Sequence, residues 1–425
     1  MDAPLPLDDQ ARSILAANCR GTYTLPTSGL YPYQWNWDSA FSASGIARFD
    51  LDRAWTELET LFSAQWPNGM VPHIVFHQFD ESYFPGPDAW GTGHQPPTSG
   101  ITQPPAAATI ARRLLRQDPK AGRHRLAGVF SKILAWHRWF DLYRCEHGAV
   151  AASHPWETGR DNAPDWDGPL EAVDVVGIEP FVRRDLQHVD PEMRPTKIDY
   201  DRYMALVQFG RDAGWDEDVI RARSPFRVAD PTLTFILLRA NLDLRVLAVE
   251  LGRPTDEIDR WIARLRQGAE ALWNPDLEAY DSYDLRGQRF AGTLSNASFL
   301  CWYAGVDNPG MVARLESLLG EVSYGVPSHP PGSRGFEPRR YWRGPVWAIM
   351  NMMIGTGLAG FGHHALASRI RCDTRRLIAG GGFSEYFDPL DGSPAGGGSF
   401  SWTAAVWLDW ASPSTMEDDH GFAKT

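Results

Sequence analysis

The sequence contains no apolar stretch that approaches the roughly 18 residues needed to span a membrane as a helix. Its start, MDAPLPLDDQARS, has neither the basic nor the apolar segment of a signal peptide. No long run of one charge sign occurs, and 53 acidic against 41 basic residues give a net charge of −12. These absences argue against a membrane or a nucleic acid as partner and predict a cytoplasmic protein, while a homo-oligomer stays open.

Cysteine pairs and the common phosphate-binding and nucleophile motifs are also missing. Four isolated cysteines without a CxxC pair are interpreted as buried free thiols: Cys19, Cys145, Cys301 and Cys372. There is no G-x-x-x-x-G-K-S/T loop, no G-x-G-x-x-G between a strand and a helix, and no G-x-S-x-G elbow. His73 and His77 are four apart, but Pro72 and the strand-like IVF between them argue against a metal pair on one helix face. We therefore expect neither a cofactor nor a metal ion.

Aromatic residues, in contrast, are abundant. The chain has 18 Trp, 13 Tyr and 20 Phe, which together make up 12% of its residues. Tryptophan combines an apolar face with an N–H donor, so it suits stacking against the C–H face of a sugar while hydrogen-bonding at the rim of a site. So many tryptophans predict more than a hydrophobic core, and they favour a small or neutral ligand such as a sugar.

Helical periodicity recurs along the chain, whereas strand-like alternation is scarce and is clearest at residues 70–76. Helices are predicted at residues 9–19, 38–48, 51–65, 104–116, 122–144, 198–213, 230–252, 255–273, 308–320, 343–360, 363–379 and 400–411. A dozen helices without alternating strand–helix units indicate an all-α protein, and twelve suits the six inner and six outer helices of an (α/α)6 barrel. Repeated four-helix bundles and a solenoid stay open, although no short sequence period supports a solenoid.

Long segments rich in proline, glycine and tryptophan separate these helices, and long loops in compact proteins are usually functional. They are expected to form the cleft of the active site and lie at residues 20–37, 66–103, 145–170, 322–342 and 380–399. No linker-like stretch divides the chain, so residues 1–425 are predicted to form one domain. Residues 66–103 are the candidate lid because of their length and composition.

Carboxylates among aromatic residues are the strongest chemical signal. The first cluster is YPYQWNWDSAF, residues 31–41, with Asp38 near a predicted helix start. Asp38 can be an N-cap, and an aromatic-lined carboxylate can also bind sugar hydroxyls; the flanking aromatics favour sugar binding.

The second cluster is HPWETGRDNAPDWD, residues 154–167, which combines four carboxylates with two tryptophans: Glu157, Asp161, Asp165, Asp167, Trp156 and Trp166. So many turn formers are also typical of a solvated surface loop. A carboxyl beside an indole is removed from water, its pKa rises, and it can stay protonated near neutral pH to protonate a leaving oxygen.

The third cluster is GGFSEYFDPLDG, residues 381–392, in which Glu385 lies between Phe383 and Tyr386. Asp388 precedes a proline and is interpreted as a turn residue. Two aromatic-embedded carboxylates, more than two hundred residues apart in sequence, are what a glycosidase needs as acid and base on either side of the anomeric carbon.

A fourth cluster, RRYWRGPVWAIMNMMIG, spans residues 339–355 and adds three aromatics, Tyr341, Trp342 and Trp347. Its arginines, Arg339, Arg340 and Arg343, can bind a substrate carboxylate bidentately, although exposed, solvated arginines are commoner.

The motifs YPYQWNWDSAF, QWPNGMVPHI, PWETGRDNAPDWD, YWRGPVWAIMN and FSEYFDPLDG, in this order, resemble those of glycoside hydrolase family 63. Within that family the chain is most similar to the short bacterial mannosylglycerate and glucosylglycerate hydrolases. The resemblance implies an (α/α)6 barrel, hydrolysis with inversion, no catalytic metal, and Asp161 as general acid with Glu385 as general base.

The resemblance also implies a substrate subsite. Its sugar contacts would be Tyr31, Trp35, Asn36, Trp37, Asp38, Tyr83, Gln103, Trp156, Gly159 and Trp347. Its glycerate contacts would be Arg194, Tyr200, Tyr341 and Trp342, where a guanidinium suits a carboxylate-bearing aglycone.

The predicted reaction is therefore hydrolysis of a small α-glycoside of D-glycerate. An inverting enzyme holds its two carboxyl groups roughly 6.5–9.5 Å apart, whereas about 5–5.5 Å indicates retention. An α-glucosidase acting on other small glycosides and a non-catalytic sugar-binding protein are the alternatives. An epimerase or lyase on a similar helical toroid is less favoured, because those chemistries usually rely on His or Tyr and only His154, at a loop edge, lies in the clusters.

Overall fold

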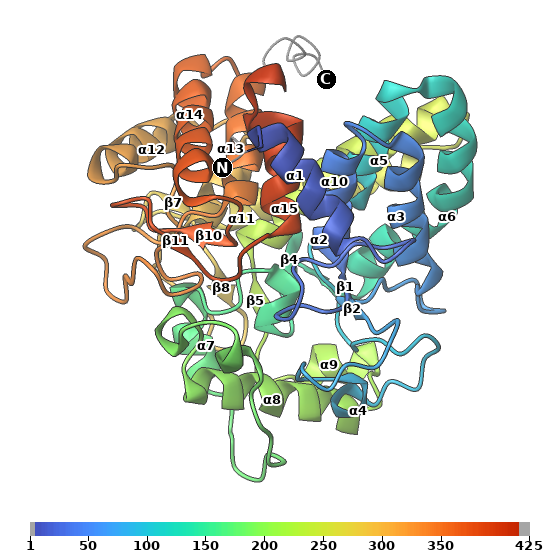
Figure 1. Ribbon diagram of the computed structural model, residues 1–425. Helices are drawn as coiled ribbons and strands as arrows, with labels where there is room; N and C mark the ends of the chain where they lie inside the picture. The colour runs from blue at the N-terminus through green and yellow to red at the C-terminus, as the bar shows by residue number, and fades with distance from the viewer. Residues whose placement is uncertain (1–4, 416–425) are drawn as a thin grey trace.

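The computed structural model describes residues 5–415, and most of its regular structure is α-helical (Figure 1). Within that range the helices are α1 (Leu7–Asn18), α2 (Asn36–Ile46), α3 (Leu51–Ser63), α4 (Pro87–Trp90), α5 (Ala107–Gln117), α6 (Pro119–Tyr143), α7 (Asp167–Glu171), α8 (Lys197–Asp212), α9 (Glu217–Arg223), α10 (Pro231–Glu250), α11 (Asp256–Ala271), α12 (Pro309–Glu321), α13 (Ala348–Gly360), α14 (His364–Gly381) and α15 (Ser401–Val406).

Three helices begin at the same local signal, an Asp or Asn followed by proline. Asp118 caps α6, Asp230 caps α10 and Asn308 caps α12; each side chain accepts a backbone N–H of the first turn. The proline at the first helical position has no N–H to leave unsatisfied, and its fixed φ suits the helix. Thr196 starts α8 with a capping box that includes Asp199. These boundaries therefore follow from local sequence.

The central helices contact one another in a closed circuit. Helix α2 contacts α5, α5 contacts α10, α10 contacts the 3-10 helix η5 (Asn296–Cys301), η5 contacts α13, α13 contacts α15, and α15 returns to α2. Further helices pack around this circuit: α3 on α2 and α5, α6 on α5 and α10, α11 on α10, α14 on α13, and α1 on α15. The core is therefore built by a ring of helices with others outside it.

Small residues allow the central helices to approach closely. Every residue of α2 is buried. A Cβ added at Gly45 of α2 would lie 2.4 Å from the Cα of Ala405 in α15, which is far inside van der Waals contact. In α13, a Cβ at Gly355 would lie 2.6 Å from the indole of Trp410. Tight packing of this kind leaves no room for a larger side chain.

Strands are more numerous than the sequence suggested, but each is short. They are β1 (Gln34–Trp35), β2 (Ile74–Val75), β3 (Cys145–Glu146), β4 (Ala149–Ala152), β5 (Val228–Ala229), β6 (Trp273–Asn274), β7 (Ala279–Tyr280), β8 (Tyr283–Asp284), β9 (Arg289–Phe290), β10 (Tyr386–Phe387) and β11 (Pro394–Ala395). Strands β3, β4, β5, β8 and β9 form one antiparallel sheet in that order. Two-residue strands show no period-2 pattern, which is why periodicity did not find them.

All twelve predicted helical segments contain a helix. However, these twelve helices are not simply the six inner and six outer helices that the sequence analysis expected. The closed circuit uses η5, which was not predicted, whereas α8 lies with α4, α7 and α9 at one end of the molecule (Figure 1). The strand expected at residues 70–76 is limited to Ile74–Val75, which pairs with Gln34–Trp35. The last segment ends in a π-helical turn at Trp407–Ala411.

The four cysteines are free, as predicted, but their burial differs. Cys301 is buried, Cys19 and Cys145 are partly exposed, and Cys372 is exposed. The expectation of burial is therefore right for Cys301 and wrong for Cys372. Across residues 5–415 no helix combines the length and apolarity required to cross a bilayer.

The contact between α11 and the β3–β4 turn gives a test of this packing. A Cβ at Gly268 would lie 2.0 Å from the carbonyl carbon of Gly148. Since backbone rather than a side-chain tip must move, Gly268→Ala is expected to lower the free energy of unfolding by about 1–3 kcal/mol in urea titrations followed by tryptophan fluorescence. Gly128→Ala, in α6 with nothing within 4 Å, is the control and is expected to stabilise by up to about 1 kcal/mol. Equal midpoints for the two variants would contradict this packing.

Candidate active site

A pocket opens at the end of the molecule where the central helices begin. Helices α2 and α15 start at its wall, and the segments just before α5 and α13 contribute further residues. The pocket is lined mainly by aromatic and ionisable side chains, as sites for small polar ligands are. Helix N-termini carry partial positive charge, so this end favours carboxylates and oxygen-rich ligands.

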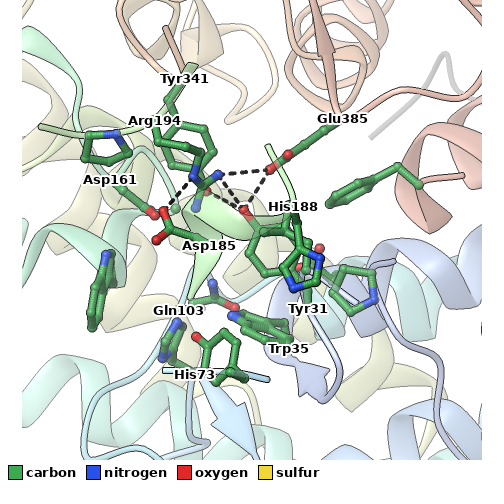
Figure 2. Close-up of a pocket in the computed structure, with 18 of the residues that line it drawn as sticks. Tyr31, Trp35, His73, Gln103, Asp161, Asp185, His188, Arg194, Tyr341 and Glu385 are labelled. Atoms are coloured by element: carbon green, nitrogen blue, oxygen red, sulfur yellow. Dashed lines mark hydrogen bonds and ion pairs between the residues drawn. The ribbon is translucent and has the colours of Figure 1, made fainter. Parts of the chain in front are cut away.

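Most of the residues singled out from the sequence line this pocket. They are Tyr31, Trp35, Trp37, Asp38, Tyr83, Gln103, Trp156, Gly159, Asp161, Arg194, Tyr200, Tyr341 and Glu385. They come from segments that span more than 350 positions of the chain. Figure 2 shows Asp161 and Glu385 on either side of Arg194 and Tyr341, with Trp35, His73 and Gln103 below them.

Three of the expected contacts lie behind the wall instead. Asn36 is fully buried, and its amide faces the carbonyls of Val71 and Pro72. Trp342 and Trp347 stack with ring centroids 3.9 Å apart, and the Trp347 indole donates to the carbonyl of Tyr341 at 3.1 Å. These residues therefore support the lining residues.

Asp161 is held by the residues around it. Arg160 is completely buried and pairs with Asp165 and Asp230 at 3.0 Å each, which anchors the loop. The Tyr203 hydroxyl donates to the Asp161 carbonyl at 2.8 Å. Gly159 has φ 72°, and a Cβ there would lie 2.5 Å from the Trp37 indole, so this loop requires glycine.

Removal from water raises the pKa of the Asp161 carboxyl to about 7. Glu385 raises it further, whereas Arg194 and a hydrogen bond with the Tyr341 hydroxyl oppose the rise. Asp161 therefore keeps its proton at pH values where an ordinary aspartate is ionised, as a general acid must.

Glu385 has a different environment, because several donors face its carboxylate. Tyr31 donates to Oε1 at 2.9 Å and the backbone N–H of Gly397 donates to Oε2 at 2.9 Å. The Glu385 N–H donates to the Gly397 carbonyl at 2.8 Å, next to the β10–β11 hairpin. Burial raises the pKa of Glu385, while Arg194, Gly397 and Tyr31 lower it by stabilising the ionised form.

Arg194 joins the two sides of the pocket. Its Nη1 donates to the Tyr31 hydroxyl at 2.8 Å and lies 4.0 Å from Glu385 Oε1 (Figure 2). Its guanidinium also lies 4.3 Å from the centre of the Tyr341 ring. One buried cation thus faces both candidate catalytic carboxyls.

Asp38 is the third carboxyl in the pocket. The N-cap of α2 is Trp35, and Asp38 lies inside the first turn, so the N-cap interpretation is wrong. Burial raises the pKa of Asp38 well above its usual range, and Glu385 and Asp161 raise it further. An aromatic-walled carboxyl of this kind can accept or donate hydrogen bonds to ligand hydroxyls.

The remaining carboxyls of the clusters have structural roles. Glu157 is fully buried and pairs with Arg144 at 2.8 Å, and Asp165 pairs with Arg160. Asp388 accepts the Leu390 N–H at 2.8 Å, as expected of a turn residue.

Other expectations from the clusters need correction. His154 directly precedes a 3-10 helix that starts at Pro155, but it is buried, and its ring faces the Tyr203 carbonyl at 3.1 Å. Arg340 pairs with Glu337 and Arg343 with Asp167, so neither faces the pocket, and Arg339 is exposed. Trp166 is buried against Phe226, away from the pocket.

The pocket contains residues that the sequence did not indicate, above all His73, Asp185, His188 and Trp402. His73 is buried, its Nδ1 has no partner within residues 5–415, and burial lowers its pKa well below the usual value. Its ring is stacked on Trp156 with centroids 6.1 Å apart. Trp402 lies in the tryptophan-rich segment after Glu385 and could have been found there; Asp185 and His188 lie in a charged loop without aromatic signal.

Two differently stabilised carboxyls in an aromatic pocket are the arrangement that a glycoside hydrolase requires, and the comparison with known families shows that the chain is one. The sequence matches the family model described as "Mannosylglycerate hydrolase MGH1-like glycoside hydrolase domain" over residues 31–403. The chain therefore belongs to this family, within glycoside hydrolase family 63, and the resemblance seen in the motifs is confirmed.

Similar proteins cover almost the whole chain. A mannosylglycerate hydrolase of Thermus thermophilus is 47% identical over 414 residues, which is 94% of this chain and 99% of its own. A glucosylglycerate hydrolase of Mycolicibacterium hassiacum is 34% identical over 440 residues, which is 96% of this chain and 98% of its own. A crystal structure of a mannosylglycerate hydrolase from Thermus thermophilus with Tris and D-glycerate matches with a TM-score of 0.93 and 46% identity, covering 96% of this chain and 100% of that chain.

The raised pKa of Asp161 predicts a pH-dependent effect on stability. Because this pKa is about 7 in the folded chain and about 3.9 in an unfolded one, the folded state binds more protons between these values. Stability therefore falls as pH rises through that window. Asp161→Asn removes the titration, so at pH 8 the variant is expected to unfold with a free energy about 1–4 kcal/mol higher than wild type. The difference should shrink toward pH 5 in urea titrations; a pH-independent difference would contradict the assignment.

Proposed function

We propose that this glycoside hydrolase cleaves a small α-glycoside of D-glycerate, with inversion, using Asp161 as general acid and Glu385 as general base. One observation supports the pair above all: both carboxyls border the same pocket, but Asp161 has a pKa of about 7, while Glu385 accepts hydrogen bonds from Tyr31 and Gly397 and lies 4.0 Å from Arg194. A protonated acid and an ionised base are the two forms that an inverting hydrolysis requires.

In the proposed reaction Asp161 gives its proton to the glycosidic oxygen as the bond from that oxygen to the anomeric carbon breaks. Glu385 removes a proton from a water molecule whose oxygen attacks the same carbon from the opposite face. Glycerate leaves with the proton from Asp161 on its hydroxyl, and the sugar is released with inverted configuration. The aromatic wall and Asp38 would orient the sugar hydroxyls.

The aglycone end is proposed to lie at Arg194, Tyr200 and Tyr341. Arg194 supplies a positive charge at the pocket wall, and the two tyrosine side chains border the same space. The Thermus thermophilus structure with D-glycerate and the names of the relatives favour glycerate as the leaving group. Relatives are named for both mannosyl and glucosyl substrates, so both hexoses are proposed as substrates.

The closed circuit of α2, α5, α10, η5, α13 and α15 supports an (α/α)6 barrel as the architecture, with η5 as one inner helix. We also propose that the chain is a single domain and acts in the cytoplasm. Residues 66–103 supply His73, Ser82, Tyr83, Phe84 and Gln103 to the wall, which supports their role as a lid over the pocket.

The acid role predicts a basic limb in the pH profile. Since the fraction of protonated Asp161 falls above its pKa, kcat/KM for glucosylglycerate should decline about tenfold per pH unit above about pH 7. α-Glucosyl fluoride has a leaving group that needs little protonation, so its kcat/KM should lack this limb. Initial rates for both substrates between pH 5 and 9 measure the difference. The same limb with both substrates would remove Asp161 from the acid role.

Substitutions distinguish the proposed roles of Asp161 and Glu385. Asp161→Asn should lower kcat for glucosylglycerate about 10²–10⁴-fold while α-glucosyl fluoride is still hydrolysed, whereas Glu385→Gln should lose both activities. Asp388→Asn, a turn residue outside the pocket, is the matched control and should keep wild-type rates. If Glu385→Gln hydrolysed both substrates at wild-type rates, its role as base would be contradicted.

Product analysis tests the reaction class and the stereochemistry. Proton NMR should detect free hexose from glucosylglycerate and mannosylglycerate, with the β-anomer formed first because the substrate is α-linked. The α-anomer as first product would overturn inversion. Binding of these glycosides without release of hexose would instead favour a sugar-binding protein, and faster release from other disaccharides would favour a general α-glucosidase.

A further inference from the structure

The segment between α7 and α8 forms a loop that projects from the end of the molecule where these helices lie (Figure 1), and it contributes Asp185, His188 and Arg194 to the pocket. It carries Arg194 as well as Arg183 and Asp185, which the chemistry described so far does not use. Neither of the latter two belongs to an aromatic cluster, so no motif singled them out. Their side chains are nevertheless nearly buried, with 9% exposure each.

Asp185 is shared between the two arginines. Its Oδ1 accepts Arg183 Nε at 3.0 Å, and its Oδ2 accepts Arg183 Nη2 at 2.6 Å and Arg194 Nε at 3.1 Å. The contact with Arg183 is bidentate, which fixes the orientation of the Asp185 carboxylate as well as pairing its charge. This oriented carboxylate accepts a single hydrogen bond from Nε of Arg194 and so holds that end of its guanidinium.

Arg183 in turn fastens Asp185 to the rest of the loop. Its Nη1 donates to the Pro195 carbonyl at 2.7 Å, directly beyond Arg194 in the chain. Its guanidinium also lies 4.3 Å from the centre of the Tyr200 ring, another proposed aglycone contact. Arg183 and Asp185 thus connect the first part of the loop to the residues around Arg194.

The Arg194 guanidinium has a nitrogen that makes no hydrogen bond to the described residues. Nε donates to Asp185 and Nη1 to Tyr31, while Nη2 has no hydrogen-bond partner in residues 5–415. Arg183 and Arg194 share the Asp185 carboxylate, and Glu385 lies 4.0 Å from Nη1 of Arg194, so the Nη2 side is the part of this guanidinium that no carboxylate of residues 5–415 contacts. A side chain with four rotatable bonds would lose much conformational freedom on binding if it were not already held.

We propose that Asp185 is a positioning residue that holds Arg194 so that its free Nη2 edge meets the carboxylate of the aglycone. Asp185 then determines the preference for charged over neutral aglycones without touching the substrate. The proposal rests on the proposed function, because it takes the aglycone to be a carboxylate. A residue that merely keeps the loop folded would affect charged and neutral substrates alike.

The test compares glucosylglycerate with glucosylglycerol, which has the same sugar and an uncharged aglycone. Asp185→Asn keeps the shape of the side chain and removes its charge. It should lower kcat/KM for glucosylglycerate about 10- to 30-fold, mainly through KM, and change kcat/KM for glucosylglycerol less than about threefold. Asp190→Asn is the matched control: the side chain of this exposed residue in the same loop accepts the Glu192 N–H, and its substitution should leave kcat/KM for both substrates unchanged.

A double substitution shows whether Asp185 acts through Arg194. In an Arg194→Gln background, Asp185→Asn should change the ratio of the two kcat/KM values less than about twofold, because the group that it positions is gone. If Asp185→Asn still lowered kcat/KM for glucosylglycerate 10- to 30-fold in that background, the proposal would be overturned. An equal fall of kcat/KM for both substrates in the single Asp185→Asn variant would also overturn it.

Binding of D-glycerate alone, measured by calorimetry, separates this proposal from the proposed function. Wild type should bind D-glycerate, and Asp185→Asn should weaken that binding about tenfold. If wild type binds D-glycerate in this way but hydrolyses no glycerate glycoside, the proposed function fails and the role of Asp185 stands. If wild type does not bind D-glycerate, the positioning proposal fails.

Discussion

The pocket is lined by four carboxyls and one guanidinium that are largely removed from water, and much of the surrounding structure stabilises these charges. An isolated buried charge is costly, so each group must be neutral, paired or hydrogen-bonded. Asp161 meets the constraint by holding its proton, since removal from water raises its pKa to about 7. Glu385 meets it through Tyr31, Gly397 and Arg194, which all favour its ionised form.

The scaffold keeps these groups in place with further buried charges outside the pocket. Arg160, completely buried between Asp165 and Asp230, fixes the backbone next to Asp161. Arg144 pairs with Glu157 and Glu217 in the same way and anchors the start of that loop. Because a buried charge without its partner is strongly destabilising, these pairs hold irregular backbone in one conformation where no helix or long strand could.

The candidate site was visible in the sequence where aromatic residues mark carboxylates. Trp156 and the turn formers near it indicated a catalytic segment but left Glu157, Asp161 and Asp165 as alternatives, and the order of the motifs was needed to select Asp161. The contacts of Glu157 and Asp165 with buried arginines explain why spacing alone could not separate them. Asp185 carries no local signal, since its contacts with Arg183 and Arg194 are supplied only by the fold.

The sequence by itself determined the helices, because a helix is specified by a 3.6-residue period and by local caps such as Asp118 and Asp230. It also determined the family, through motifs that keep their order. The tertiary structure decided which helices form the central circuit, placing η5 there and α8 elsewhere. It also decided which carboxyls face the pocket, because burial and pairing depend on contacts between segments hundreds of residues apart. Those contacts raise the pKa of Asp161 and surround Glu385 with donors, and no periodicity along the chain encodes them.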